Sequence, residues 1–504
     1  MLEGNTTLRL VILIVYLGII VGFGLYQGLK AKSATDYNMG GRNIPGWVAA
    51  LSERATAESA WCLVGFPGFA YTSGMITFWT ALGLALGNVI AWSFIAKRFR
   101  EEAADYEAET YVDWVVKRHG NSKAAKTIRL IGAIIVVFIF VAYVEAQVLG
   151  GGKTLNVMFG LPVTVGILLT MIVIIPYTVV GGFQSVVHTD CIQSIIMIFT
   201  LIVTPIVGII WIAHQPEGAV YAHSLGEAMA KAGPEYLSWT NGAKGFAAGM
   251  AIAGEFAWII AYLGGLPHLT VRFMSVKDEK NWKTGRNIAI GWTICGYTGA
   301  ILIGLVGLAI FGPGAIADEE MIMPSVALTV LPSAIGIICV VGAIAAMIST
   351  ADSMLVVASS EFCESILKPR MRANGRDLSA KDGLRVSRVV TVVFGLIAAA
   401  LPFILPSNTV YGVVSFAWAG MGNPFAVVSC CTLFWKKYTG KAAAWTMIVG
   451  FLGTVIWTLT PALNNVVNAR LAGVIPAIIT AIVVTNLTQN SDKADQITEG
   501  GEAA

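Results

Sequence analysis

The sequence carries little charge. Asp, Glu, Lys and Arg make up 12% of its 504 residues, while 56% are hydrophobic. Soluble domains carry about twice that share of charge. Long apolar runs recur from Leu8 to Leu487, and the net charge is only +3. This composition predicts an all-α protein that crosses the lipid bilayer many times, and it excludes a nucleic-acid-binding surface.

Several motifs that would indicate other protein classes are missing. None of the seven cysteines forms a CxxC pair, so neither a structural metal nor a disulfide framework is expected. There is no GxxxxGK[ST] loop, no HExxH and no GxSxG. Lys153 follows three glycines, but the first glycine of a nucleotide-binding loop is absent, and we expect Lys153 in an external loop. An enzyme or an ATP-driven pump is therefore not supported, and any transport would draw on an ion gradient.

Thirteen apolar segments, each long enough to span a bilayer, lie between residues 8 and 487. Lys and Arg gather after alternate segments, for example Lys97 and Arg98 after the third, and Arg272 and Lys277 after the seventh. By the positive-inside rule, this alternation predicts a multi-pass protein of the cell membrane with its N-terminus outside and its C-terminus in the cytoplasm.

The spans suggest a division of the chain into parts. We expect a first span and a cytoplasmic loop, a first five-helix repeat, an external loop that holds a short helix, a second five-helix repeat, two further spans and a disordered cytoplasmic tail; these correspond to residues 1–45, 46–213, 214–242, 243–435, 436–488 and 489–504. No internal sequence repeat is visible, and the sequence does not define the oligomeric state.

The most informative polar group lies in the ninth span, in the run ISTADSM. Ser349, Asp352 and Ser353 fall at helix positions i, i+3 and i+4 and so share one face, with Thr350 at its edge. A carboxylate ringed by hydroxyls inside an apolar segment suits an alkali cation or a proton. The alternative is structural: the hydroxyls bond back to carbonyls of their own helix, and the carboxylate pairs with a neighbour.

The second span contains a charged cluster in the run LSERATAESAW. Arg54 and Glu58 stand at helix positions i and i+4, so an ion pair between them would explain both charges without a role in binding. Glycines and Pro67 follow, so this span is a candidate for an unwound helix that offers carbonyls to a cation. Glycines 264 and 265 and Pro267 make the seventh span a second candidate for a broken helix.

Other polar and aromatic residues fall inside the spans. Glu145 lies in the fourth span near Tyr143, Asp190 begins the sixth, and Glu255 precedes Trp258 and Tyr262 in the seventh. Aromatic residues at this spacing more often serve packing than ligand binding. The small residues around Trp418 in the eleventh span likewise suit close helix packing.

At these residues the sequence resembles the sodium:solute symporter family, in particular its sodium/proline symporter branch. The resemblance extends over nearly the whole chain. It is carried by DYNMGGR (36–42), WCLVGFPGFAYTSG (61–74), YTVVGGFQSVVHTDCIQ (177–193), GLPHLTVRFMSV (265–276), AAMISTADSMLVVASS (345–360) and SFAWAGMG (415–422). It implies a core of two inverted five-helix repeats with one span before it and two after it.

The resemblance also implies three groups of site residues. A sodium site is implied at the backbone carbonyls of Ala55, Glu58 and Ala346 and the hydroxyls of Ser349 and Thr350. A second cation site is implied at Asp190, Ser349, Asp352 and Ser353, and a solute site at Ser59, Tyr143, Trp258, Tyr262 and Trp418. Sodium is the implied coupling ion, and proline or a similar small molecule is the implied solute.

Three features depart from the family pattern, and two further carboxylates are unexpected for a proline transporter. Ala57 stands where sodium/proline symporters carry an aspartate, and Glu53 and Arg54 stand where small residues are usual. The segment from Trp258 to Tyr262 needs a one-residue insertion before Pro267 to align at both ends. Glu145 and Glu255 add two carboxylates that are not expected in a transporter for proline alone.

The sequence therefore predicts a sodium-coupled symporter that imports a small polar solute, proline or a related amino acid. One alternative keeps the fold but takes a different, cationic solute or couples to protons, and Glu58, Glu145 and Glu255 favour it. An alternative of another class is a transporter-like membrane sensor. Such sensors usually carry an appended signalling domain, and the tail after Leu487 is too short for one.

Overall fold

The computed structural model describes residues 6–28, 40–120, 123–376, 379–404 and 409–501. The first part of the DYNMGGR segment and the last three residues of the predicted tail lie outside these ranges. Within them the chain is helical, and the one β contact is an isolated bridge between Ile44 and Val276. Because a bilayer offers no water to backbone groups, each span satisfies its own N–H and C=O groups as a helix.

The helices of the first half include one peripheral span and several broken ones. They are α1 (Thr6–Gly28), η1 (Gly40–Arg42), α3 (Gly46–Ala60), η2 (Trp61–Gly65), α4 (Phe66–Ser73), η3 (Gly74–Ile76), α5 (Thr77–Ile90), η4 (Ala91–Ile95), α6 (Ala96–Asp105), α7 (Tyr111–His119), α8 (Lys123–Phe159), α9 (Val163–Ala213), α10 (Leu225–Ala232) and α11 (Pro234–Leu237). The predicted short helix of the 214–242 loop is confirmed by α10.

The second half follows the same pattern. Its helices are α12 (Gly245–Phe256), α13 (Ile259–Tyr262), α14 (Pro267–Ser275), α15 (Glu279–Phe311), η5 (Glu319–Met321), α16 (Ile322–Val330), α17 (Ser333–Phe362), η6 (Cys363–Leu367), α18 (Lys368–Ala373), α19 (Ala380–Ile404), α20 (Val410–Phe434), α21 (Gly440–Thr458), α22 (Pro461–Asn464), α23 (Ala469–Ala472) and α24 (Val474–Gly501). The backbone of α24 is helical up to Gly501, where the sequence predicts a disordered tail, because no proline or glycine interrupts it between Pro476 and Gly500.

Among the described residues, eleven helices are long and apolar enough to cross a membrane. One of them, Gly46–Asp105, is interrupted at Ser59 and again at Gly74, and a shorter apolar helix covers Val163–Val179. The polytopic helical fold is thus confirmed, while the exact number of thirteen spans stays a prediction.

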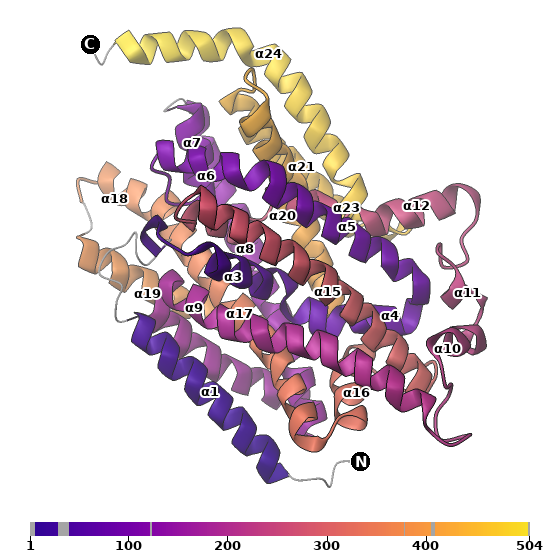
Figure 1. The fold of residues 1–504 in the computed structure, drawn as a ribbon. Helices are drawn as coiled ribbons and strands as arrows, with labels where there is room; N and C mark the ends of the chain where they lie inside the picture. The colour runs from indigo at the N-terminus through magenta and orange to yellow at the C-terminus, as the bar shows by residue number, and fades with distance from the viewer. Residues whose placement is uncertain (1–5, 29–39, 121–122, 377–378, 405–408, 502–504) are drawn as a thin grey trace.

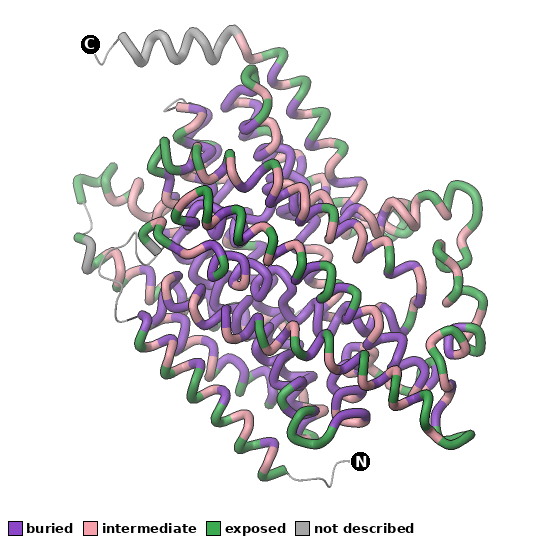
Figure 2. The backbone as a smooth tube through the Cα atoms, in the orientation of Figure 1, coloured by how far each residue is buried: buried purple, intermediate pink, exposed green. Residues whose placement is uncertain are grey.

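The helices wrap around α17, which carries the ISTADSM run. This helix packs against α3, α8 and α9. In its most apolar stretch of 18 residues, 83% of the residues are buried, compared with 22% in α1 at the edge of the molecule. Figure 2 shows the buried backbone concentrated in the middle of the molecule. In Figure 1, α11 and α16 lie toward the lower right, and α7 and α18 lie toward the upper left.

Candidate functional site

The second span breaks in the middle of the molecule, as its polar cluster predicts. Ser59 adopts φ 51° and ψ −169°, a left-handed conformation that costs a non-glycine residue about 1–3 kcal/mol. Two hydrogen bonds hold the break: Ala60 N–H donates to Gln147 Oε1 of α8 at 3.0 Å, and Trp61 N–H donates to Ser59 Oγ at 3.0 Å. Because Gln147 takes the Ala60 N–H, the Thr56 carbonyl one turn earlier loses its usual helical partner.

The hydroxyls of α17 meet these freed carbonyls. Ser349 Oγ lies 3.1 Å from the Ala55 carbonyl and 2.9 Å from that of Ala346, and Thr350 Oγ1 lies 3.1 Å from the Thr56 carbonyl. All of these residues are fully buried. Neutral hydroxyl and carbonyl oxygens are hard donors of the kind that an alkali cation prefers.

The sodium-site residues that the resemblance implies come together, with one exception. Ala55, Ala346, Ser349 and Thr350 are neighbours through the contacts above. The carbonyl of Glu58 instead accepts the N–H of Trp61, and no hydrogen bond among the described residues joins that carbonyl to α17. The Thr56 carbonyl lies against Thr350 and is the acceptor that the sequence did not point to.

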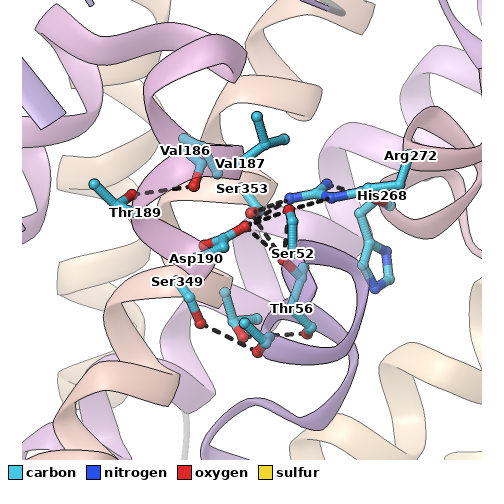
Figure 3. A network of polar contacts seen from close by, with 12 residues as sticks. Ser52, Thr56, Val186, Val187, Thr189, Asp190, His268, Arg272, Ser349 and Ser353 are labelled. Carbon is cyan, nitrogen blue, oxygen red and sulfur yellow. Dashed lines mark hydrogen bonds and ion pairs between the residues drawn. The ribbon is translucent and has the colours of Figure 1, made fainter. Parts of the chain in front are cut away.

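Next to this contact, Arg272 of α14 holds a buried polar network (Figure 3). Its guanidinium donates to Ser353 Oγ at 2.6 Å, to Thr56 Oγ1 at 3.0 Å and to Ser52 Oγ at 3.1 Å, and it lies 3.3 Å from Asp190 Oδ2. Ser52 Oγ also donates to Asp190 Oδ2 at 2.6 Å. Both Arg272 and Asp190 are fully buried.

The position of Arg272 corrects the sequence expectation. The charge pattern groups it with the basic loop residues after the seventh span, but it lies inside α14 and has no exposed surface. Lys153 is a similar correction: it belongs to α8, is 5% exposed and pairs with Asp318 at 2.9 Å and Glu320 at 2.6 Å, so it is not in a loop. In the sequence alone, a basic residue beside glycines or beside a predicted loop looks like part of that loop. The burial of Arg272 and Lys153 was therefore not predictable from their local sequence.

Of the residues implied for a second cation site, only some belong to the Arg272 network. Asp190 and Ser353 are bound to Arg272, and Ser353 Oγ also lies 3.1 Å from Thr56 Oγ1. Asp352 is fully buried, and neither of its carboxylate oxygens accepts a hydrogen bond of good geometry from the described residues. Two buried carboxylates with one guanidinium leave an excess of one negative charge, which a buried site must balance with a bound cation or a proton.

The charged cluster of the second span forms a separate network. Arg54 is fully buried and pairs with Glu53 and, at 2.8 Å, with Glu58, so the predicted i, i+4 pairing is confirmed. Arg54 Nη1 also donates to Thr293 Oγ1 of α15 at 2.8 Å and to the Tyr262 hydroxyl at 3.1 Å. Through Tyr262 the charged cluster therefore links α3 and α15 to α13 and to the aromatic side chains around it.

The five residues implied for the solute site form one cluster around the break. The Tyr143 hydroxyl lies 3.3 Å from Ser59 Oγ and accepts a hydrogen bond from Trp418 Nε1 at 3.0 Å. The Trp418 ring packs against those of Trp258 and Tyr262, with centroids 5.3 and 5.4 Å apart. None of the five is more than 3% exposed, so the cluster is closed to both ends of the molecule.

This cluster rests on a second helix break. The seventh span is interrupted between α13 and α14, where Gly264 adopts φ +85°. A Cβ at Gly264 would lie 2.8 Å from the Ser429 side chain, and Ser429 Oγ donates to the Gly264 carbonyl at 2.7 Å. Only glycine fits this close approach with a positive φ. The predicted break in the seventh span is thus confirmed.

If this cluster binds the solute, as the resemblance implies, Tyr143→Phe is expected to raise the solute KM by about three- to tenfold, because the change removes one hydroxyl and leaves the buried Trp418 N–H without its acceptor. Solute-dependent uptake in reconstituted vesicles measures this. Tyr438→Phe is the matched control, because among the described residues its hydroxyl bonds only to Thr446, outside the cluster. An unchanged KM in Tyr143→Phe would show that the hydroxyl does not shape the site.

Comparisons with known proteins show the family of this chain. The model of the sodium:solute symporter family matches residues 37–450. The osmoregulated proline transporter OpuE of Bacillus subtilis is 32% identical over 477 residues, covering 94% of this chain and 93% of that protein. The high-affinity proline transporter PutP of the same organism is 31% identical over 481 residues, covering 94% and 97%. A sodium/proline symporter of Staphylococcus aureus is 29% identical over 496 residues, covering 96% and 92%.

Solved structures support the fold. A sodium-coupled sialic acid symporter, in a substrate-bound outward-open state, superposes with a TM-score of 0.76 at 19% identity, covering 95% of this chain and 98% of that one. At this identity the likeness concerns the fold alone, and it confirms the predicted transporter architecture. The family model covers both helix breaks, the hydroxyls of α17 and the aromatic cluster, and its relatives are transporters and not enzymes. These matches support sodium as the coupling ion. The chain belongs to the sodium:solute symporter family.

Proposed function

We propose that this protein imports proline, or a closely related amino acid, together with sodium. The observation that carries the proposal is the meeting of Ser349 and Thr350 with the carbonyls of Ala55 and Thr56 at the break of α3. A cation bound between α17 and α3 would fix the broken helix, and with it the solute cluster, in one arrangement. Relatives that cover most of this chain are named proline transporters, which supports the choice of solute.

The sodium site that we propose has backbone carbonyls of Ala55, Glu58 and Ala346 and hydroxyls of Ser349 and Thr350 as its ligands. We add the Thr56 carbonyl, because it lies 3.1 Å from Thr350 Oγ1. Thr56 also connects this site to the Arg272 network through its own side chain. Sodium bound at the Thr56 carbonyl would therefore also affect the Thr56 side chain, which contacts Arg272. Through this contact, sodium would influence how Arg272 holds α3, α9 and α17 together.

A second cation at Asp190, Ser349, Asp352 and Ser353 remains part of the proposal. Its support is the excess negative charge of two buried carboxylates around one guanidinium. The solute site that we propose contains Ser59, Tyr143, Trp258, Tyr262 and Trp418. Its support is their contact with one another at the two helix breaks.

We propose that the molecule sits in the cell membrane with α11 and α16 toward the outside and α7 and α18 toward the cytoplasm. Basic residues support this orientation, since α7 and α18 lie toward the same end in Figure 1, and these helices carry Lys117 and Arg118 and Arg370 and Arg372, respectively. The division of the chain into two five-helix repeats, 46–213 and 243–435, with flanking segments is part of the same proposal.

Coupling to protons, or a cationic solute, is the second candidate. Asp352 favours proton coupling, because it is fully buried and has no ion-pair partner among the described residues, so a bound cation or a proton must balance its charge. A cationic solute has less support, because Glu58 and Glu255, both close to the aromatic cluster, are already paired with Arg54 and Arg470.

Uptake into proteoliposomes that contain the purified protein separates these possibilities. An inward sodium gradient is expected to drive accumulation of labelled proline, which an excess of unlabelled proline abolishes and which choline in place of sodium does not support. Accumulation driven by a pH gradient in the absence of sodium would establish the proton-coupled alternative. Competition by lysine or arginine, but not by proline, would establish the cationic solute.

A further inference from the structure

Another buried arginine, Arg470 of α23, lies against the aromatic cluster. Its side chain is almost fully buried, and Arg470 lies beyond residue 450, where the match to the family model ends. Its Nη2 lies 2.8 Å from Glu255 Oε1, its Nη1 donates to Ser415 Oγ at 2.6 Å, and its Nε donates to the Gly254 carbonyl at 3.1 Å. Arg470 therefore joins α12, α20 and α23 in one contact.

The same pair contacts the solute cluster directly. The Arg470 guanidinium lies over the Trp258 ring, 4.7 Å from its centroid. The other oxygen of Glu255 accepts hydrogen bonds from Thr80 of α5 at 2.7 Å and from the Tyr411 hydroxyl of α20 at 3.1 Å. The Tyr411 ring in turn packs against Trp61 and Trp258, with centroids 6.1 and 5.9 Å apart. The pair thus covers one side of the cluster.

The α23 segment has contacts that do not involve the Arg470 side chain. Asn423 of α20 donates to the Ala469 carbonyl at 3.1 Å, and Asn468 accepts the N–H of Arg470 at 2.9 Å as an N-terminal cap. Removing the guanidinium is therefore expected to leave the segment docked, but to leave Glu255 without its cation. Loss of one partner of a buried charge pair weakens the contact between the elements that the pair joins.

We propose that Arg470 is a positioning residue that, together with Glu255 and Tyr411, closes the outer end of the solute site. In the closed arrangement of this structure, the pair holds α12 against α20 above Trp258. For a solute to enter from outside, the Arg470–Glu255 and Tyr411–Glu255 contacts must part, and they re-form once the solute lies below them. The assignment to the outer end rests on the proposed function and orientation, whereas the closure itself rests on the contacts.

Hydrogen exchange of the purified protein in lipid nanodiscs, with sodium and without solute, tests this closure. In Arg470→Ala we expect amide exchange of the outer segments 245–262 and 410–418 to accelerate about tenfold or more, while segment 268–276 around Arg272 exchanges as in the wild type. Tyr411→Phe, which removes only the hydroxyl that reaches Glu255, is expected to give a smaller acceleration in the same segments. Arg470→Lys is expected to restore protection in part, since it keeps the charge.

Arg9→Ala is the matched control, because Arg9 is another buried arginine on a peripheral helix, where it donates to the Met158 carbonyl. It is expected to leave both outer segments unchanged. The proposal is overturned if these segments keep wild-type exchange in Arg470→Ala, or if exchange rises equally in segment 268–276, which would show a general structural role. Since the measurement contains no solute, a failure of proline uptake by the wild type would overturn the proposed function alone.

Discussion

Replacing Ser349 and Thr350 together by alanine should raise the sodium concentration for half-maximal uptake by about a hundredfold or more. The contact of a hydroxyl oxygen with a buried cation is comparable in strength to a hydrogen bond to a charged group, which contributes about 1.5–3 kcal/mol, and 1.4 kcal/mol corresponds to a factor of ten. The two hydroxyls lie 3.1 Å from carbonyls of the broken helix and are fully buried, so water has no access to replace them. Initial rates of uptake over a range of sodium concentrations measure the effect.

Two sets of variants separate loss of sodium binding from loss of structure. Ser349→Thr and Thr350→Ser keep a hydroxyl at each position and are expected to retain sodium dependence. Ser359→Ala is the matched control, because Ser359 is a fully buried serine of the same helix whose hydroxyl, among the described residues, bonds only to the Val356 carbonyl within that helix. If the double alanine variant needs no more sodium than the wild type, α17 does not bind the coupling ion.

Replacing Arg272 by alanine should destabilise the protein by about 3–5 kcal/mol and abolish uptake, because it leaves buried carboxylates without their cation. Arg272 contacts residues of α3, α9 and α17 at once, so among the described residues no neighbouring side chain is placed to take over its role. The thermal stability of the purified protein, followed by size-exclusion chromatography after heating, measures the first effect.

The double variant Arg272→Ala/Asp190→Ala gives the sharper comparison. If the loss arises from the uncompensated charge of Asp190, removing both partners is expected to recover much of the stability, although not the transport. Arg286→Ala is the control, since within the described part of the chain the side chain of Arg286 hydrogen-bonds only to Asn287 at the surface, and its loss should change stability by less than about 0.5 kcal/mol. Wild-type stability of Arg272→Ala would contradict the role assigned to this network.

Much of the fold could be predicted from local sequence, because the bilayer makes local signals strong. A polar cluster inside an apolar segment and paired glycines before a proline each mark a helix break, and the breaks occur at Ser59 and between Tyr262 and Pro267. The hydroxyls of the ISTADSM run also lie where the chemistry predicts, against backbone carbonyls of the second span.

The partners across helices were harder to predict, because they depend on distances along the chain that no local pattern records. Arg272 reaches Asp190 and Ser353, each about 80 residues away, and its position near a basic loop hides its burial. Gln147 supports the break at Ser59 from α8, and no local pattern in the sequence marks it as the partner of the second span. Glu255 is recognisable as unusual, but its partner Arg470 lies more than 200 residues away in a segment without any motif.

Simultaneous measurement of labelled sodium and labelled proline entering the same proteoliposomes tests the central claim most directly. The account predicts that each proline molecule enters with at least one sodium ion, and that the double alanine variant of Ser349 and Thr350 loses both fluxes together at moderate sodium concentration. Proline entry without any accompanying sodium, or with the sodium flux unaffected in that variant, would contradict it.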